Sequence, residues 1–365
     1  MKLTENAISL GIRQDMLDKA LISAGNASSI ARVMDKANRG EPITVGVIGG
    51  SVTVGGCATS REKGYAGLVR TWWERTFPNS EINYVNAGYS GTSSLLGVHR
   101  VDEMLLSHNP DFVIVEFGVN DVIMDFQQEA YASLIHKIVT ADCAPAVMVL
   151  FIMSDGPINA QADQIPVCRH YDLPMISYLD SVWPEVKNEK NPDGQYPWSD
   201  ICADWVHPTD MGHAIVAELV TAYLSDVLAA VDTLKEKEFP IPEEPFRPYV
   251  YKDAKWLHCE NTTPDAMGSF KVFTNECCSW QNDGEDPLVL KVKAKRIILP
   301  ICTPYSDDLK VTVRVDGVEK ALPPYIIRGG IFTNFVIVDD AEVAEHTVEI
   351  LPNGDTVWCG GLFIS

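Results

Sequence analysis

A serine, a histidine and a carboxylate stand in short segments whose residue types fit acyl-transfer chemistry. Ser51 comes directly after the apolar, β-branched run 43–48 and two glycines, whereas Asp204 and His207 share the segment Asp-Trp-Val-His. A serine hydroxyl is a weak nucleophile until a histidine accepts its proton, and a carboxylate must hold that histidine in the productive tautomer. The spacing lets Asp204 reach Nδ1 of His207 while Nε2 faces the serine. These three residues therefore predict a Ser–His–Asp triad.

An acyl-transfer site also needs donors for the negatively charged oxygen of the tetrahedral intermediate, each typically worth about 3 to 4 kcal/mol of barrier. The candidates are the backbone N–H groups of Ser51 and Gly91 and the side-chain amide of Asn120. Purely structural interpretations stay open for each residue. Ser51 would then end an ordinary Gly-Gly-Ser turn, Gly91 would permit a left-handed turn, and Asn120 with Asp121 would cap a helix.

Four segments, in chain order, resemble the four sequence blocks of the SGNH (GDSL-like) hydrolases. The segments are Gly49-Gly50-Ser51, Asn86-Ala87-Gly88-Tyr89-Ser90-Gly91, Gly118-Val119-Asn120-Asp121 and Asp204-Trp205-Val206-His207. By this resemblance Ser51 is the nucleophile, Gly91 and Asn120 are oxyanion donors, His207 is the base and Asp204 completes the triad. The resemblance covers residues 43–225 and implies an ester hydrolase that works through an acyl-enzyme, with neither a metal nor a cofactor.

One position departs from the family pattern. The first block usually has the sequence Gly-Asp-Ser, whereas Gly50 replaces the aspartate here. A side chain that helps to order the nucleophile loop is therefore missing. Some members that resemble carbohydrate esterases have Gly-Gly-Ser followed by a β-branched residue and threonine, as in Ser51-Val52-Thr53. The resemblance thus favours sugar esters over lipids.

The segment before the triad is polar and aromatic, and it supplies the candidate substrate-binding residues Trp198, Asp200 and Trp205. Aromatic rings stack on the apolar faces of sugars, although the same rings also serve as core or surface packing. We therefore expect an O-acetyl esterase whose partner is an acetylated hemicellulose oligosaccharide of the mannan or xylan type. A lipid or thioester acyl hydrolase would share the catalytic residues. A non-catalytic sugar-binding protein is the third alternative.

Strand-like apolar runs alternate with helical spacing along the first two thirds of the chain. Strands are predicted at 43–49, 81–86, 111–117, 146–152 and 175–178, a loop at 184–198, and helices at 7–38, 64–75, 94–108, 127–140 and 211–231. Such alternation predicts right-handed βαβ units and a parallel sheet covered by helices on both faces. The fold class is therefore α/β of the SGNH type, and the site is expected at the carboxyl ends of the strands.

The composition changes near Lys235, where charges mix with prolines. We predict a catalytic domain over 1–234, with N-terminal helices in 1–40, and a semi-rigid linker over 235–248. Short alternating runs and the turn signals Asp316-Gly317 and Asn353-Gly354 follow. They predict a smaller all-β sandwich over 249–365, of a carbohydrate-binding-like kind.

The amino-acid composition excludes some classes of binding partner. The formal net charge of −21 would repel nucleic acids and anionic membranes, so neither is expected as a partner. The nine cysteines are scattered without a C-x-x-C pair, as is typical of reduced cytosolic thiols. There is neither an evident signal peptide nor an apolar stretch of membrane-spanning length, so a cytoplasmic location is expected. The eight histidines lack metal-ligand spacing, and a homo-oligomer stays open.

Overall fold

The computed structural model describes residues 1–121, 125–156, 159–238, 240–275, 278–305, 310–322 and 333–365. These residues divide into two compact units, Met1–Val250 and Tyr251–Ser365.

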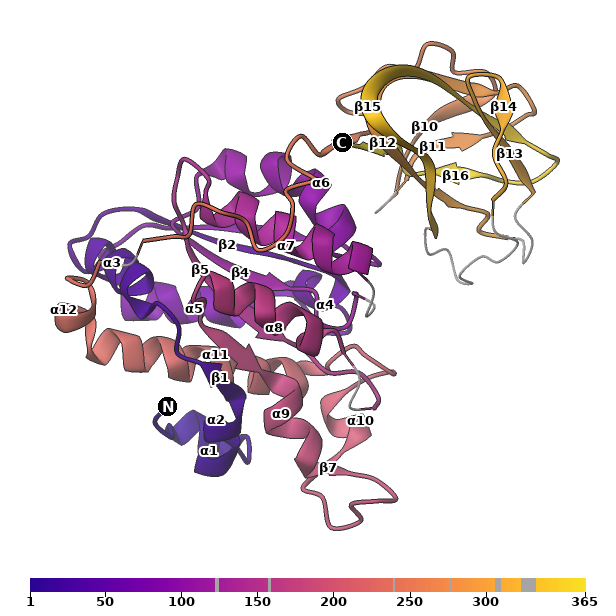
Figure 1. Cartoon of the computed structure of the whole chain (residues 1–365). Coiled ribbons are helices and arrows are strands. Elements are labelled where there is room, and N and C mark those ends of the chain that lie inside the picture. Colours follow the sequence, from indigo (N-terminus) through magenta and orange to yellow (C-terminus); the bar gives the residue numbers. More distant parts are fainter. Residues whose placement is uncertain (122–124, 157–158, 239, 276–277, 306–309, 323–332) are drawn as a thin grey trace. The chain divides into compact units, whose positions relative to one another are not determined.

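A six-stranded sheet forms the centre of the first unit, in the order β1-β6-β5-β4-β2-β3 (Figure 1). Its strands are β1 (Leu21–Ser23), β2 (Ile43–Gly49), β3 (Ile82–Gly88), β4 (Phe112–Glu116), β5 (Ala146–Phe151) and β6 (Met175–Ser177). Neighbouring strands are parallel, except that β1 runs antiparallel to β6. The predicted parallel α/β sheet is confirmed.

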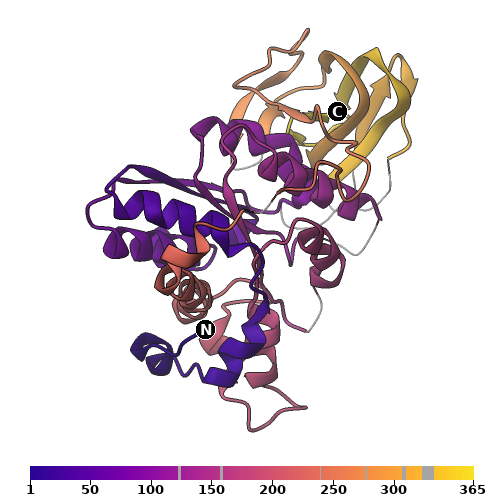
Figure 2. The same ribbon diagram turned by 60° about the vertical axis from the view of Figure 1, so that its left-hand side comes forward.

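Helices cover both faces of this sheet (Figure 1, Figure 2). The longer ones are α3 (Ala27–Asn38), α5 (Tyr65–Thr76), α6 (Ser94–Met104), α7 (Asp125–Val139), α8 (Gln161–His170) and α11 (Asp210–Ala229). The shorter elements are α1 (Glu5–Ser9), α2 (Gln14–Ala20), α4 (Ser51–Val54), α9 (Tyr178–Val182), α10 (Trp198–Ile201), α12 (Val231–Leu234), the 3₁₀ turns η1 (Arg61–Lys63), η2 (Leu106–His108) and η3 (Trp183–Glu185), and the two-residue strands β7 (Val186–Lys187) and β8 (Tyr196–Pro197). Helix α11 packs with α3 and α5, and α7 packs with α6 and α8.

Two segments differ from the prediction. The N-terminal region forms three helices and the edge strand β1, rather than one or two helices. Leu21 and Ile22 fit a helical pattern, but this segment lies against the open edge of β6 and its backbone pairs there. The predicted loop 184–198 contains the short parallel ladder of β7 and β8 and the start of α10. In both places tertiary contacts override local propensity.

The central strands are continuous apolar runs because both faces of the sheet are covered. All five residues of β4 are buried, and so is every residue of β2 except the half-buried Thr44. Gly46 has no side chain, which leaves room for Leu105: an added Cβ would lie 2.5 Å from Leu105 Cδ1. This close packing fixes the position of β2 relative to Leu105, which follows α6.

The strand order places a topological switch at the end of β2. The chain leaves β2, forms β3 on one side of it, and returns to form β4 on the other side. The loops that follow β2 and β4 therefore leave in different directions at the carboxyl ends of the strands, which is where open α/β sheets bind ligands. Ser51 follows β2 and Asn120 follows β4, so both lie at this edge.

Helix α11 is long and apolar enough to cross a membrane when only its length and composition are considered. However, 72% of its most apolar stretch is buried inside the structure. The buried residues include Glu218, which accepts hydrogen bonds from the side chains of Thr4 and Asn6. Such burial is typical of a core helix.

The described residues of the segment 235–248 contact the first unit at both of its ends. The Lys235 ammonium lies 2.8 Å from Asp35 Oδ1, and the Arg247 guanidinium donates to Gln128 Oε1 at 2.7 Å. The described part of this charged, proline-containing segment is thus attached to the helices of the first unit.

The second unit is an antiparallel β-sandwich, as predicted. Its strands are β9 (Lys255–Leu257), β10 (Phe270–Asn275), β11 (Cys278–Asn282), β12 (Leu288–Cys302), β13 (Val311–Val315), β14 (Val318–Glu319), β15 (Thr333–Pro352), β16 (Trp358–Cys359) and β17 (Leu362–Ile364). The long strands β12 and β15 pair with register shifts near Ala294 and Ile297. Bulges of this kind bend strands, so the sheet curls over its core. Asp316 and Gly317 have φ of +53° and +77°, the tight hairpin turn between β13 and β14.

Candidate active site

Ser51 stands where β2 ends, as the first residue of α4. Backbone N–H groups in the first turn of a helix have no acceptor within the helix, so the N–H of Ser51 is free to serve another acceptor. Gly50 precedes it and lies directly against Asn120: an added Cβ would come 2.2 Å from Asn120 Oδ1 and 2.8 Å from Nδ2. The glycine in place of the usual aspartate therefore lets the Asn120 amide pack beside the nucleophile loop.

The three predicted triad residues form one hydrogen-bonded chain. Nε2 of His207 lies 2.7 Å from Oγ of Ser51, and Nδ1 of His207 lies 2.6 Å from Oδ2 of Asp204. The His207 side chain is 24% exposed and that of Asp204 is 40% exposed. With Nδ1–H donating to the carboxylate, Nε2 is left as the acceptor that a serine nucleophile requires.

The loop that carries Asp204 and His207 is held by its own backbone. Oδ1 of Asp204 accepts from the N–H groups of Val206 and His207, at 2.8 and 2.7 Å. The indole N–H of Trp198 donates to the carbonyl of Asp204 at 2.7 Å, and the side chain of Thr209 caps α11 immediately after the loop. One carboxylate oxygen thus shapes the loop while the other orients the imidazole.

Hydrogen bonds lower the pKa of the Asp204 carboxyl group. Partial burial by itself would raise the pKa of this carboxyl, but the backbone and side-chain hydrogen bonds of His207 and the N–H of Val206 outweigh burial and lower the pKa. Asp204 is therefore ionised at neutral pH and stabilises a proton on His207.

The loop after β4 is fixed by Asp121, which is 7% exposed. Its carboxylate accepts from the N–H of Ser94 at 2.8 Å and from the side-chain amides of Gln127 and Gln164 at 2.9 and 2.8 Å. Burial raises its pKa to about 6, against these hydrogen bonds, which lower it. Asp121 therefore binds the N-terminus of α6 rather than only capping the helix that follows it, and this holds the neighbouring Asn120 in place.

Gly91 lies in the loop after β3 with φ of +70°, a backbone conformation that glycine adopts without strain. The buried guanidinium of Arg100 connects this loop to the end of β2. It donates to the carbonyl of Gly49 at 2.9 Å and to Oγ1 of Thr92 at 3.2 Å, and it also bonds the carbonyl of Ala87. Arg100, which the sequence alone does not single out, thus ties the nucleophile strand to the Gly91 loop.

A fully buried carboxyl, Glu116, ends β4 beneath the site. Oε1 accepts from the N–H of Gly118 at 3.0 Å. Burial is the main cause that raises the pKa of Glu116, the hydrogen bond from Gly118 opposes it and the charge of Asp121 adds to it, and together they bring the pKa to about 8. Glu116 is therefore mostly protonated at neutral pH.

The predicted substrate-binding residues differ in exposure. Trp205 is 64% exposed and stands between the two triad residues of its loop. Trp198 is half-buried, packs edge-to-face against Trp183 with an interplanar angle of 74°, and donates its indole N–H to the carbonyl of Asp204, so it supports the triad loop. Asp200 is exposed, and its backbone carbonyl accepts from Thr209. Of the three, Trp205 offers the free aromatic surface nearest to the triad in sequence.

Two residues without a role in the sequence prediction shape the loop after α4. Nδ1 of His213 accepts from the N–H of Tyr65 and Nε2 donates to the carbonyl of Gly56, both at 3.1 Å, and burial lowers the pKa of this imidazole. Cys57 is exposed beside the triad with φ of +62°. Burial raises the pKa of its thiol, and so does the charge of Asp204, so the thiol is not a competing nucleophile at neutral pH.

Comparisons with known proteins agree with this geometry. Residues 47–215 match the model of the GDSL-like lipase/acylhydrolase family. A thioesterase 1/protease 1/lysophospholipase L1 of Escherichia coli (strain K12) is 24% identical over 175 residues, which are 45% of this chain and 81% of that protein. An arylesterase of Vibrio mimicus is 25% identical over 133 residues, 35% of this chain and 61% of that protein.

A solved structure resembles both units. A two-domain esterase (CEX) active on acetylated mannans has a TM-score of 0.84 and 27% identity, covering 96% of this chain and 98% of that chain. The same kind of esterase co-crystallised with mannopentaose has a TM-score of 0.80 and 27% identity, with 96% and 97% coverage. The residues that carry this likeness agree with the geometry of the site: the match to the GDSL-like lipase/acylhydrolase family over residues 47–215 includes the hydrogen-bonded Ser51, Asp204 and His207.

Proposed function

We propose that this protein is a serine esterase that removes O-acetyl groups from acetylated hemicellulose oligosaccharides of the mannan or xylan type, with mannan favoured. The observation that carries the esterase activity is the continuous Ser51–His207–Asp204 hydrogen-bonded chain, with distances of 2.7 and 2.6 Å. The sugar substrate is supported by the likeness to an esterase active on acetylated mannans, which extends over both units.

Acylation begins when Ser51 Oγ attacks the acetyl carbonyl carbon. Nε2 of His207 takes the hydroxyl proton, and the carboxylate of Asp204 stabilises the imidazolium that forms. The carbonyl oxygen becomes an oxyanion, for which the N–H groups of Ser51 and Gly91 and the amide of Asn120 are the donors. When the C–O bond to the sugar breaks, His207 returns the proton to the sugar hydroxyl, and the acetyl group stays on Ser51.

Deacylation repeats these steps with water. His207 takes a proton from the water that attacks the acetyl carbonyl, and the same donors hold the second oxyanion. Collapse of that intermediate releases acetate, and His207 gives the proton back to Ser51 Oγ.

Trp205 and the acidic character of the chain fit a neutral glycan. An exposed indole beside the triad gives a flat apolar surface for a sugar ring. The net charge of −21 gives an uncharged oligosaccharide an advantage over an anionic ligand. The proposal includes a cytoplasmic setting with an imported oligosaccharide, and the seven free cysteines among the described residues suit such a reducing compartment.

A lipid or thioester acyl hydrolase is the second candidate, because the Escherichia coli relative bears the names of both activities. It would use the same triad and differ in the acyl chain that it accepts. A purely sugar-binding role does not explain why Ser51, His207 and Asp204 form a hydrogen-bonded chain.

The test compares acyl groups and glycans on the wild-type protein. Acetate release is measured from acetylated manno-oligosaccharides and acetylated xylo-oligosaccharides, alongside hydrolysis of nitrophenyl acetate and nitrophenyl octanoate. We expect acetate from the manno-oligosaccharides and a strong preference for acetate over octanoate. Efficient octanoate cleavage without acetate release from either glycan would overturn the sugar proposal and favour the lipid or thioester alternative.

A further inference from the structure

Three side chains with different metal-ligand atoms meet at the exposed edge of the triad. The Sγ of Cys57, a carboxylate oxygen of Asp204 and a ring nitrogen of His207 all lie within 4.8 Å of one another. Cys57 comes from the loop after α4, whereas Asp204 and His207 come from the loop before α11. Thiolate, imidazole and carboxylate are the protein ligands that Zn²⁺ prefers.

The Cys57 loop is anchored on both sides of the thiol. Before it, the carbonyl of Gly56 accepts from Nε2 of His213 at 3.1 Å. After it, the N–H and hydroxyl of Thr59 donate to Asp210 at 2.8 and 2.7 Å. His213 and Asp210 both belong to the first turn of α11, which directly follows the triad loop. One helix end therefore positions all three ligands.

The spacing needs only a small adjustment to hold an ion. Ligand atoms around a tetrahedral zinc lie roughly 3 to 4 Å apart, given metal–ligand distances of about 2.0 to 2.3 Å. Cys57 is exposed, so rotation of its side chain can close the remaining gap, and ions reach the site directly from solvent.

We propose that Cys57, Asp204 and His207 form an inhibitory binding site for Zn²⁺. The thiol proton of Cys57 passes to solvent when the sulfur binds the ion. The ion binds the unprotonated Nε2 of His207 and a carboxylate oxygen of Asp204, while Nδ1 of His207 keeps its proton, so Nε2 no longer accepts the proton of Ser51. Mg²⁺ and Ca²⁺ prefer oxygen ligands and do not substitute. Inhibition rests on the proposed esterase function, whereas metal binding does not.

The first experiment titrates ZnCl₂ into the nitrophenyl acetate assay of three proteins: wild type, Cys57→Ser and Cys143→Ser. Cys143 is a free, half-buried cysteine of the first unit and serves as the matched control. We expect half-inhibition of wild type and Cys143→Ser at a Zn²⁺ concentration at least about tenfold lower than for Cys57→Ser, which corresponds to about 1.4 kcal/mol. EDTA restores activity, and Mg²⁺ at equal concentration has no effect. Equal zinc sensitivity of all three proteins would overturn the proposal.

The second experiment detects binding without catalysis. Co²⁺ is added to the wild type and to Cys57→Ser, and the near-ultraviolet thiolate-to-cobalt charge-transfer band is recorded as a difference between the two spectra. We expect the band in the wild type and its loss in Cys57→Ser, with Cys143→Ser unchanged. Identical spectra for wild type and Cys57→Ser would contradict the site. A cobalt band without hydrolysis of any ester would instead support the site and count against the proposed function.

Discussion

At the scale of single residues, polar groups of the candidate active site serve either the proposed chemistry or the support of the loops. Asp204 is the clearest case, because one oxygen orients His207 and the other accepts two backbone N–H groups of its own loop. Gly50 is the opposite case: its lack of a side chain makes room for the Asn120 amide. The chemistry therefore depends on contacts that an alanine scan of the triad alone would overlook.

Asp204→Asn should lower kcat on nitrophenyl acetate by about 10³- to 10⁴-fold. The amide oxygen can keep the backbone hydrogen bonds of the loop, which turns the NH₂ group toward Nδ1. His207 then carries its proton on Nε2 and does not accept that of Ser51. Asp193→Asn, a change of an exposed acid in the segment before α10, is the control and should retain activity. A kcat of Asp204→Asn within twofold of wild type would exclude Asp204 from the triad.

Trp205→Ala should raise KM for acetylated manno-oligosaccharides by about 3- to 10-fold, because loss of a stacking surface removes on the order of 1 kcal/mol. The indole is 64% exposed, so the fold does not depend on it. Kinetics with nitrophenyl acetate, which carries no sugar, should stay within twofold, and Trp205→Phe should restore most of the oligosaccharide KM. Equal losses on both substrates would show that Trp205 positions the triad instead of the glycan.

At the scale of elements, the carboxyl ends of β2, β3 and β4 are fastened to one another and to the helices. Arg100 on α6 bonds carbonyls at the ends of β2 and β3, and Asp121 bonds the first turn of the same helix. Glu116 lies buried at the end of β4. The site is thus built on the rigid edge of the sheet, with one further loop brought in by α11.

Glu116→Gln should flatten the pH dependence of stability. The pKa of Glu116 rises from 4.5 to about 8 on folding, so between these values the folded protein holds a proton that the unfolded chain releases. Stability therefore falls as pH rises through this window, and the loss is complete above about 8. Glutamine mimics the protonated acid and does not ionise. Thermal unfolding at pH 5, 7 and 9 should show a wild-type Tm that drops more than the variant's; parallel profiles would contradict the assignment.

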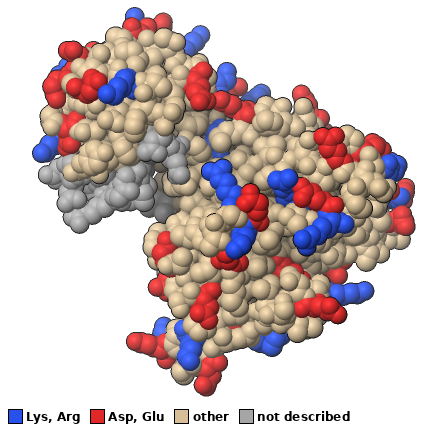
Figure 3. Space-filling model, turned by 180° about the vertical axis from the view of Figure 1, so that it is seen from behind, with Lys and Arg blue, Asp and Glu red and all other residues tan. Residues whose placement is uncertain are grey.

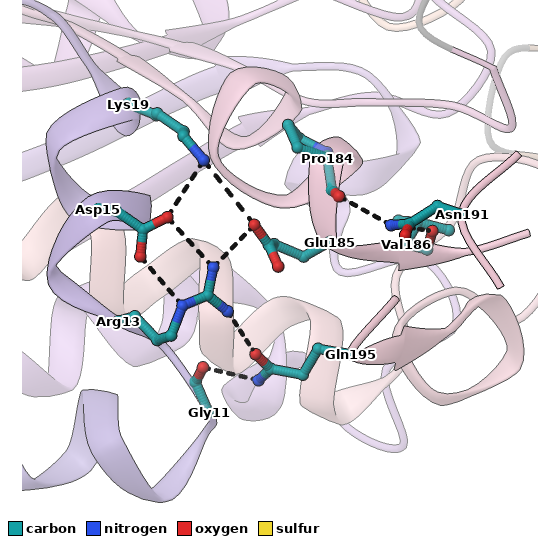
Figure 4. A network of polar contacts seen from close by, with 9 residues as sticks. All are labelled: Gly11, Arg13, Asp15, Lys19, Pro184, Glu185, Val186, Asn191 and Gln195. Carbon is teal, nitrogen blue, oxygen red and sulfur yellow. Dashed lines mark hydrogen bonds and ion pairs between the residues drawn. The ribbon is translucent and has the colours of Figure 1, made fainter. Parts of the chain in front are cut away.

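A polar network joins the N-terminal segment to the 184–195 loop (Figure 4). Arg13 pairs with Glu185 at 2.8 Å and donates to Gln195 at 2.8 Å, and Gln195 in turn donates to the carbonyl of Gly11 at 2.6 Å. These side chains hold the loop that leads into α10 and the triad segment. The N-terminal region is therefore part of the support for the site.

Arg13→Ala should loosen this loop without unfolding the protein. Exposed ion pairs are each worth about 0 to 1 kcal/mol, so the Tm should change little. Amide hydrogen exchange should become faster in 184–197 and stay unchanged in the sheet. Arg39→Ala, which removes another exposed arginine that pairs with Asp35 and Glu41, is the control. Unchanged exchange in 184–197 would mean that the loop is held by other contacts.

At the scale of the whole molecule, a hydrolase unit and a sandwich unit share one acidic chain. On the face shown in Figure 3, lysine and arginine side chains lie among aspartates and glutamates. Within the sandwich, Trp280 and Tyr251 are buried, whereas Tyr305 is 79% exposed and lies 6.4 Å from the half-buried Trp358, ring centre to ring centre. A carbohydrate-binding role of this unit stays a prediction, and Tyr305 with its neighbour Trp358 is where it would be tested.

The alternation of strands and helices, the sandwich and the residues of the four blocks could be predicted from the sequence, because they depend on local patterns. Strand β1 could not be predicted from the sequence. Its three residues fit a helical pattern and form a strand because the open edge of β6 lies beside them. The hydrogen bonds of Arg100 and the approach of Cys57 to His207 could not be predicted either, because both depend on loops that come together only in the folded chain. The role of Gly50 needed the position of Asn120.

Ser51 is the proposed nucleophile of an esterase that deacetylates oligosaccharides. The most direct measurement is acetate release from acetylated manno-oligosaccharides by wild type, Ser51→Ala and the control Ser60→Ala, whose serine is exposed in the neighbouring loop. We predict release by wild type and Ser60→Ala and a loss of at least about 10³-fold in Ser51→Ala. Retention of more than a tenth of the wild-type rate by Ser51→Ala would exclude Ser51 as the nucleophile.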